Sequence, residues 1–315
     1  MGEGGANVAR GALISVADAR ANADALTFVD ASWHMPDAKR SGVSEFAASR
    51  LRASATFLDV DATSDRDASA PHQLPAPEAF EAAIRALGLR ESDDIVIYDR
   101  DGMFSAARAW WMFRAHGWEN VRVLDGGAPA WRASGFDEDT SPRSEEEIRA
   151  PAKKCEEIMR ARRAREGDAP SKDFKGTREE LVKSKADVLE NLSTRAFQLV
   201  DARGAARFRG ETKEPRAGVR SGHIPGSRNV FFGELLDGDK RFKSVEEMRR
   251  VFEASGLDLS AGGKPIVASC GTGVTACILA LGLHRCGVEN VAVYDGSWTE
   301  WGSDENCPLA TGHPE

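Results

Sequence analysis

One cysteine in this sequence has neighbours that could make it a nucleophile. An apolar stretch, residues 266–269, leads into Cys270; Gly271 and Gly273 follow, and an apolar helical pattern begins near Val274. The two glycines let the backbone turn its N–H groups toward the Cys270 sulfur, and the helix directs its positive end to the same point. Both effects favour the thiolate, which is the reactive form of cysteine. Cys270 is therefore the candidate nucleophile.

The loop after this cysteine restricts what it could bind. A loop that holds a phosphate dianion needs an arginine or lysine as a charged clamp. Neither residue occurs from Gly271 to Leu283. Phosphatase chemistry is therefore disfavoured, and we expect a smaller or less charged group beside the sulfur.

Composition describes an acidic protein with room for two domains. The chain has 315 residues, a formal net charge of −8 and a pI near 5.5. It lacks the basic footprint of a nucleic-acid binder, and the short arginine-rich run at 160–165 is interpreted as a solvated face. No apolar run approaches the roughly 18 residues of a membrane span. Neither nucleic acid nor membrane is an expected partner.

The cysteines and the first residues bear on the compartment. Five cysteines, unevenly spaced and without a CxxC pair, predict neither a disulfide framework nor a structural zinc site, and favour a reducing compartment. Cys277 and Cys286 lie in the apolar helical pattern and are expected in its core. Residues 1–20 contain two arginines and two acids, a poor signal or transit peptide. We expect the cytoplasm, with mitochondria as the alternative, and neither cofactor nor metal.

The chain repeats itself at long period. Residues 95–99 (IVIYD) match 266–270 (IVASC) at an offset of 171, and 117–121 (GWENV) match 287–291 (GVENV) at 170. A period this long indicates duplication of a domain. We predict a first domain at 1–136 and a second at 174–315. The charge-dense segment 137–173 is interpreted as a linker with room for a surface helix.

Each copy predicts an α/β fold. Short apolar strands alternate with helical patterns, which implies a mostly parallel sheet with helices on both faces. Ligands in such sheets bind at the carboxyl ends of strands, where Cys270 stands. Asp99 replaces the cysteine in the first copy, so only the second copy can supply the nucleophile. The segments are 96–98, 106–115 and 121–124 in the first copy and 266–268, 274–284 and 291–294 in the second.

Several motifs together resemble the two-domain rhodanese family across nearly the whole chain. They are the tandem arrangement, residues 222–227 (GHIPGS), the Cys270 loop and residues 294–301 (YDGSWTEW). The resemblance implies two tandem rhodanese-like domains. It also implies transfer of sulfane sulfur through a persulfide on the loop cysteine to a thiophilic acceptor. The first domain would be inactive and packed over the site.

The loop sequence separates two branches of that family. Thiosulfate-using members carry basic residues in the loop, whereas CGTGVTA at 270–276 resembles the branch that takes sulfur from 3-mercaptopyruvate. A neutral loop with the Thr272 hydroxyl suits a keto thiol whose carboxylate lies at a distance. By resemblance, the substrate-binding loop residues are Gly271, Gly273, Val274 and Thr275.

The substrate carboxylate needs a cation. Residues 203–218 match the family's RF-G…EPR-G pattern, which implies that Arg207 and Arg216 bind the carboxylate. The planar fork of arginine binds carboxylates in a bidentate way, and two forks also fix orientation. Arg203 and Arg209 are expected to be ordinary exposed arginines.

The resemblance also implies a proton relay. Residues 57–61 (FLDVD) and 70–72 (APH) match the family positions of an Asp and a His from the first domain, which pairs Asp61 and His72 with Thr272. His72 would move a proton to or from the substrate or the leaving enolate, and Asp61 would orient its ring. A purely structural His72 is the alternative. Phe104 stands where animal members often have Tyr, so no phenol acts there.

These observations predict a cofactor-free sulfurtransferase. The Cys270 thiolate would attack the sulfur of 3-mercaptopyruvate, release pyruvate and pass the sulfur to a thiol, thioredoxin or cyanide. Two alternatives stay open: thiosulfate as the donor, and a carrier that holds a persulfide without turnover. The two arginines favour a small carboxylate substrate over the carrier.

Overall fold

The computed structural model describes residues 11–164 and 176–314. Two predictions therefore fall partly outside it: the character of residues 1–20, and the linker at 137–173 with the domain boundaries that flank it. Among the described residues, no helix is long and apolar enough to span a membrane.

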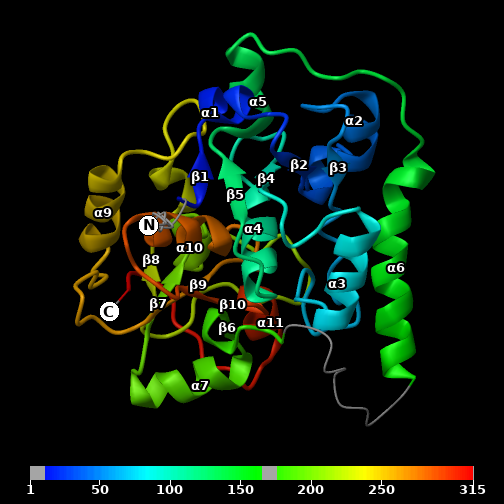
Figure 1. Cartoon of the computed structure of the whole chain (residues 1–315). Coiled ribbons are helices and arrows are strands. Elements are labelled where there is room, and N and C mark those ends of the chain that lie inside the picture. Colours follow the sequence, from blue (N-terminus) through cyan, green and yellow to red (C-terminus); the bar gives the residue numbers. More distant parts are fainter. Residues whose placement is uncertain (1–10, 165–175, 315) are drawn as a thin grey trace, which may run out of the picture.

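Each half of the chain forms a five-stranded parallel sheet surrounded by helices (Figure 1). The strand orders β1-β5-β4-β2-β3 and β6-β10-β9-β7-β8 are the same when the halves are aligned, which confirms the predicted α/β fold. The first half comprises β1 (Leu13–Ile14), α1 (Val16–Ala21), β2 (Thr27–Asp30), η1 (Pro36–Ala38), α2 (Gly42–Ala48), β3 (Thr56–Phe57), α3 (Pro77–Ala86), β4 (Ile95–Tyr98), α4 (Ala106–Ala115), β5 (Val121–Leu124) and α5 (Gly127–Ala133). After α6 (Glu145–Arg163) come η2 (Glu179–Leu181), β6 (Val182–Lys183), α7 (Lys185–Thr194), β7 (Gln198–Asp201), α8 (Ala205–Phe208), β8 (Arg228–Asn229), η3 (Phe232–Leu235), α9 (Val245–Ala254), β9 (Ile266–Ser269), α10 (Ala276–Arg285), β10 (Ala292–Tyr294) and α11 (Ser297–Ser303).

The strands are apolar on both faces because both faces are covered. In β4, Ile95 and Ile97 point into one buried cluster, while Val96 and Tyr98 point into another on the opposite face. This alternation follows from the two-residue period of a strand. All four residues are fully buried, as expected for a central strand of a parallel sheet.

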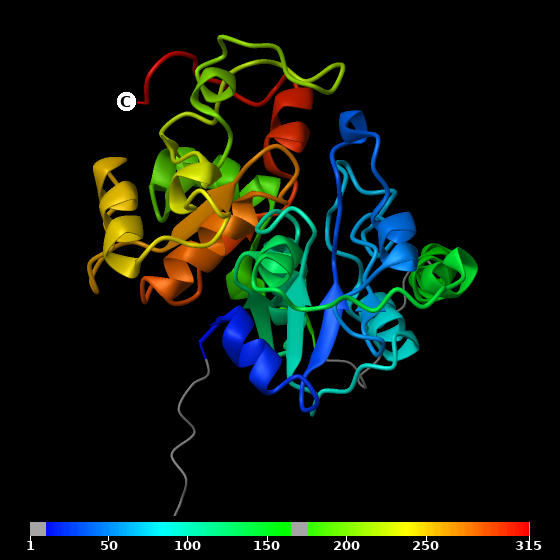
Figure 2. The same cartoon turned by 90° about the horizontal axis from the view of Figure 1, so that it is seen from above.

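One core spans both domains. Helices α4 and α10 pack against each other, and their side chains belong to a single buried cluster that includes strand residues of both sheets. Both helices are apolar nearly all round, as buried helices are. Viewed from above, the two sheets flank this helical contact (Figure 2). The beginning of α10, next to Cys270, therefore lies close to the first domain.

The predicted surface helix is present as α6. Its buried residues, Ile148, Ala152, Cys155 and Met159, recur every three to four positions. Cys155 and Met159 pack with Ala79 and Ala83 of α3, and Ile148 belongs to the buried cluster that contains residues of α2. Figure 1 shows α6 alongside α3. The arginines at its end pair with carboxylates of the first domain: Arg162 with Glu78, and Arg163 with Asp65 and Asp67.

The two domains dock through equivalent contacts. The Leu74 N–H donates to Asp295 Oδ2 at 2.7 Å, and at the matching place the Phe242 N–H donates to Asp125 Oδ1 at 3.0 Å. We call the loops that carry Leu74 and Phe242 the docking loops. Each contains a residue with left-handed backbone, His72 (φ 68°) in the first and Lys240 (φ 62°) in the second. Each domain thus presents one loop to the strand ends of its partner, and His72 stands in the loop that covers Cys270.

Candidate active site

The Cys270 sulfur lies in a backbone cradle at the carboxyl end of β9. Its Sγ accepts a hydrogen bond from the Gly273 N–H at 3.1 Å, and the Cys270 N–H donates to Ser297 Oγ at 3.2 Å. Gly273 adopts φ 82°, a conformation open to glycine. Helix α10 begins at Ala276, slightly later than expected.

The structural role of Gly271 differs from the predicted one, which was to let the backbone turn. Its φ is not in the left-handed region, so it is not needed for the turn. A Cβ at this position would lie 3.3 Å from Arg207 Nη2. The missing side chain therefore leaves room for an arginine beside the cysteine.

The first domain contains the same cradle with a carboxylate in it. Asp99 Oδ2 accepts the N–H groups of Phe104, Ser105 and Ala106 at 2.8, 2.9 and 2.9 Å, and Oδ1 accepts that of Asp101 at 3.0 Å. Three converging donors at a helix start hold an anionic oxygen there. The Cβ of Lys240 packs over this cradle, 2.7 Å from where a Cβ on Gly102 would lie. This copy has no thiol and is closed.

The residues predicted for the relay are in contact. His72 Nδ1 lies 2.9 Å from Thr272 Oγ1, and His72 Nε2 lies 2.7 Å from Asp61 Oδ1. The Trp33 Nε1–H donates to Asp61 Oδ2 at 2.9 Å. Burial acts to raise the pKa of Asp61, but the hydrogen bond and charge of His72 and the bond from Trp33 hold that pKa below its usual 3.8. The ring of His72 is buried and has a partner on each nitrogen.

Two arginines flank the cysteine, and they differ. Arg207 already binds Glu214 through Nε (3.2 Å) and Nη2 (2.6 Å). Arg216 pairs with no carboxylate in the described ranges. Burial and the neighbouring charge of Arg207 lower the pKa of Arg216. Arg216 is thus the freer cation for an incoming carboxylate.

The expectation for Arg203 is wrong. It is 2% exposed, and its guanidinium binds Asp201, Glu214 and the Gly222 carbonyl. It also stacks over Trp298, with Cζ 4.6 Å from the ring centroid. Its carboxylate partners stand only two and eleven positions away in the sequence. The Trp298 ring against which it packs comes from the far end of the chain, and no local pattern reveals that contact. Arg209 is partly exposed and pairs with Glu211.

Cys270, Thr272, Arg207 and Arg216 line one pocket of about 380 Å³, whereas His72 and Asp61 are not part of its lining. Its cationic and nucleophilic side belongs to the second domain, whereas Trp33, Met35 and Phe104 come from the first. Trp33 and Phe104 are stacked at 6.0 Å. This apolar wall was missed by sequence reasoning, which noted Phe104 alone. The lining is Trp33, Met35, Phe104, Ala202, Arg203, Gly204, Arg207, Pro215, Arg216, Phe231, Phe232, Cys270, Gly271, Thr272, Val274 and Thr275.

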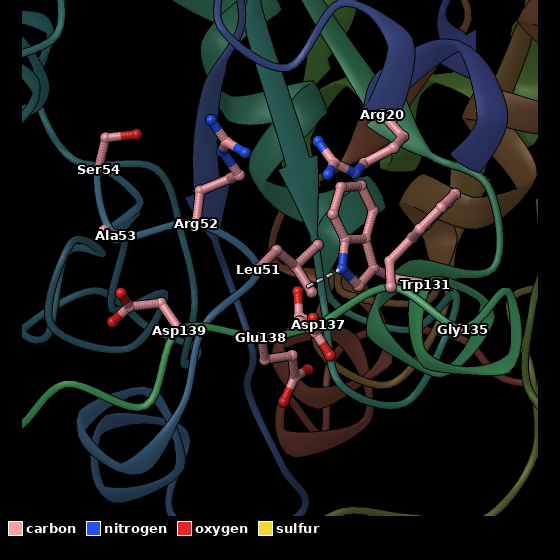
Figure 3. A pocket seen from close by; sticks show the side chains of 11 residues that line it. Arg20, Leu51, Arg52, Ala53, Ser54, Trp131, Gly135, Asp137, Glu138 and Asp139 are labelled. Carbon is pink, nitrogen blue, oxygen red and sulfur yellow. Dashed lines mark hydrogen bonds between the residues drawn. The ribbon is translucent and has the colours of Figure 1, made fainter.

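A larger hollow of about 630 Å³ lies in the first domain, beside Trp131 and Arg20 (Figure 3). Two of its charged residues pair with residues outside its lining: Arg52 binds Asp24, and Glu138 binds Arg132. None of the described residues that line it is a cysteine or a histidine. No group of three or more His, Cys, Asp or Glu side chains within 11–164 and 176–314 is arranged to hold a metal ion.

The other cysteines are poor competitors for Cys270. All five are free and buried, and Cys270 alone lines the 380 Å³ pocket. Burial raises the pKa of Cys155 and of Cys277 to about 12, and it also raises the pKa values of Cys286 and Cys307. These four thiols therefore stay protonated near neutral pH. Cys277 and Cys286 lie in the core around α10, as expected.

Comparison with known proteins agrees with this architecture. The model of the "Rhodanese-like domain" matches twice, at residues 15–134 and 184–304. The chain is 44% identical to "Thiosulfate/3-mercaptopyruvate sulfurtransferase 1, mitochondrial" of Arabidopsis thaliana, over 90% of this chain and 73% of that protein. It is 40% identical to the 3-mercaptopyruvate sulfurtransferase of Rattus norvegicus, over 88% and 84%.

A solved structure shows the same fold. The 3-mercaptopyruvate sulfotransferase SseA from Escherichia coli superposes with a TM-score of 0.73 at 31% identity, covering 91% of this chain and 99% of that one. Two parallel sheets, each with a loop at the end of its central strand, define a tandem sulfurtransferase fold. The chain belongs to the rhodanese family.

Proposed function

We propose that the protein is a 3-mercaptopyruvate sulfurtransferase with Cys270 as its nucleophile. The observation that carries the proposal is the pocket itself. It brings together a thiol in a neutral backbone cradle and the flanking Arg207 and Arg216, and its lining residue Thr272 contacts His72. Relatives of this name, at 40% identity, support it.

The arginines suit the carboxylate of the donor. Arg216 has its donors free in the described structure, and Arg207, held by Glu214, adds positive charge beside it. A carboxylate bound to Arg216 is held in a bidentate geometry. That geometry fixes the distance between the bound carboxylate and the reacting sulfur. The substrate sulfur is therefore held in position for attack by Cys270.

The transfer balances without a cofactor. The Cys270 thiolate attacks the sulfur of 3-mercaptopyruvate, an S–S bond forms, and the C–S bond breaks with its electrons left on the pyruvate enolate. The thiol proton of the donor moves to the enolate carbon, which yields pyruvate and a Cys270 persulfide anion. His72, between Thr272 and Asp61, is the group placed to carry that proton.

The first domain supports the next step, the holding of a persulfide. The terminal sulfur of a persulfide lies two bonds beyond Cβ, as Oδ2 of Asp99 does. Asp99 Oδ2 takes three backbone N–H groups. The matching donors around Cys270 are those of Val274, Thr275 and Ala276. We therefore expect these three N–H groups to bind the terminal sulfur.

The acceptor and the compartment belong to this proposal. A thiol, thioredoxin or cyanide would attack the terminal sulfur and restore the Cys270 thiolate. The pocket volume of about 380 Å³, with its apolar wall, leaves space for an acceptor larger than the donor. We place the reaction in the cytoplasm, with mitochondria as the alternative compartment.

Thiosulfate is the second candidate donor, because relatives include proteins with both names. The loop argues for the keto thiol: no lysine or arginine follows Cys270 before Arg285 to meet a dianion. We expect kcat/KM for 3-mercaptopyruvate to exceed that for thiosulfate by at least about tenfold, or roughly 1.4 kcal/mol. Initial rates with both donors and cyanide as common acceptor test this. Equal kcat/KM values for the two donors, or a higher value for thiosulfate, would assign the protein to the thiosulfate-using branch.

A carrier without turnover is distinguished by its product. Steady-state release of pyruvate from 3-mercaptopyruvate is expected of the enzyme, whereas a carrier stops after one equivalent.

A further inference from the structure

A buried cation from the non-catalytic domain lies behind the active site. Arg108, in α4, is fully buried. Its Nη2 donates to the His72 carbonyl and, at 2.9 Å, to Asp295 Oδ1. Its guanidinium lies over the Trp111 ring, with Cζ 4.5 Å from the centroid. Its Nη1 is 3.0 Å from where a Cβ on Gly273 would lie, so a side chain there would push the guanidinium out of place.

The backbone of His72 is in an uncommon conformation. Its φ of 68° is a left-handed conformation that a residue with a Cβ adopts at a cost of about 1–2 kcal/mol and keeps only when its surroundings enforce it. Its ring is bound by Thr272 and Asp61, and it packs edge to face with the Trp33 ring, with 4.7 Å between the ring centroids. The side chain is held by these groups, while its backbone carbonyl is held by Arg108.

The internal repeat provides a control for this reading. Helices α4 and α10 match at an offset of 170, so the counterpart of Arg108 is Ile278, a fully buried residue of the apolar core. On that side the Phe242 N–H donates to Asp125, and the two arginines whose charges act on Asp125, Arg241 and Arg285, are partly exposed. Docking therefore does not require the arginine. The buried arginine occurs on the side where the docking loop carries His72.

We propose that Arg108 is a positioning residue that fixes the backbone of His72 and so holds the imidazole on Thr272. This inference rests on the proposed function, because it assumes that His72 moves the proton from the donor thiol to the enolate carbon. Arg108 touches neither substrate nor reacting atoms in this account. Its effect appears only in the step that His72 serves.

Two donors separate that effect from a loss of structure. With thiosulfate, the Cys270 thiolate takes the outer sulfur and sulfite leaves with the S–S electrons, so no proton moves to carbon. For Arg108→Met we expect kcat with 3-mercaptopyruvate to fall about tenfold or more, with KM within about twofold of wild type. The thiosulfate rate should stay within about twofold. Arg108→Lys, which keeps the charge and a donor, should retain an intermediate kcat with 3-mercaptopyruvate.

A double-mutant cycle with His72→Ala tests the link directly. If Arg108 acts through His72, adding Arg108→Met to His72→Ala causes no further loss. Equal losses with both donors, or additive losses in the cycle, would show that Arg108 only supports the fold. A wild-type rate in Arg108→Met would overturn the proposal outright.

Two controls complete the experiment. Arg108→Met combined with Asp295→Asn removes both charges together, so no lone carboxylate is left buried if the single variant folds poorly. Asp125→Asn changes the matching contact on the other side and should leave both donor activities unchanged. Failure of the wild-type protein to turn over 3-mercaptopyruvate would refute the proposed function, and it is seen before any variant is made.

Discussion

Side chains around Cys270 fall into two groups according to how visible they are in the sequence. Cys270 could be predicted from its residue type and its immediate neighbours, and the contact of Thr272 with His72 from the family resemblance. Arg203 and Arg108 could not. Arg108 is buried against Asp295, which is 187 positions away. Arg203 has Asp201 two positions away, but the Trp298 ring over which it packs comes from the far end of the chain.

Arg216 provides a test at the residue scale. Arg216→Lys keeps the charge but loses the bidentate fork, so we expect KM for 3-mercaptopyruvate to rise about tenfold or more. Thiosulfate has no carboxylate and should be affected less. Steady-state kinetics with both donors measure the difference, and Arg209→Lys, on the same loop but paired with Glu211, is the matched control. Equal losses with both donors would mean that Arg216 supports the loop.

At the scale of elements, the strands and central helices follow from the sequence, and their docking does not. The apolar run at β4 and the helical pattern at α4 predict both elements near their observed bounds. The contact of loop 65–74 with Asp295 depends on residues more than two hundred positions apart. No local pattern encodes such a pairing. The α6 face packed on α3 is also recognisable only in the fold, because its polar face dominates the composition.

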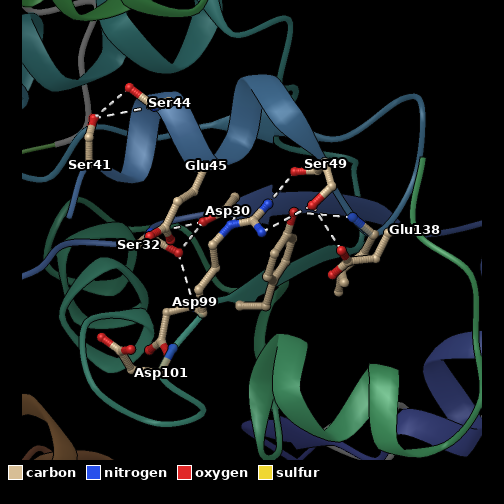
Figure 4. Close-up of polar contacts among 12 residues, drawn as sticks. Asp30, Ser32, Ser41, Ser44, Glu45, Ser49, Asp99, Asp101 and Glu138 are labelled. Carbon is tan, nitrogen blue, oxygen red and sulfur yellow. Dashed lines mark hydrogen bonds and ion pairs between the residues drawn. The ribbon is translucent and has the colours of Figure 1, made fainter. Parts of the chain in front are cut away.

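The strand-end network of the first domain predicts a pH dependence. Asp30, at the end of β2, accepts hydrogen bonds from the Ser32 N–H at 3.0 Å and from Arg100 Nε at 3.2 Å (Figure 4). Burial outweighs these partners and raises the pKa of Asp30 from 3.8 to about 6. Between these values the native state binds more protons than the unfolded chain. The free energy of unfolding therefore falls as pH rises through that window.

Asp30→Asn removes this titration. The wild-type free energy of unfolding, relative to the variant, should decrease by up to about 3 kcal/mol between pH 4 and 6.5. Urea unfolding at several pH values in that range measures it. Parallel pH profiles for the two proteins would rule out a raised pKa for Asp30.

Across the whole molecule, one buried cluster joins the two domains, and the matching docking contacts on either side of it are unequal. Asp295 neutralises the buried Arg108 and accepts the Leu74 N–H, whereas Asp125 accepts a single N–H. Removing one partner of a buried ion pair leaves an uncompensated charge, which is far costlier than losing one neutral hydrogen bond.

We therefore expect Asp295→Ala to lower the free energy of unfolding by about 3 kcal/mol or more. Asp125→Ala should lower it by about 1 kcal/mol. Chemical unfolding of the two variants beside wild type makes the comparison. A larger loss for Asp125→Ala would contradict the inference that Asp295 makes the stronger of the two docking contacts.

The central claim is that Cys270 receives the sulfur of 3-mercaptopyruvate. The most direct measurement is the intact mass of the protein after exposure to that donor without an acceptor. Wild type should gain the mass of one sulfur atom, located on Cys270 by peptide mapping, with one equivalent of pyruvate released. Cys270→Ser should gain nothing and release no pyruvate. A mass gain in Cys270→Ser, or in wild type a gain located on another of the five cysteines, would contradict the account.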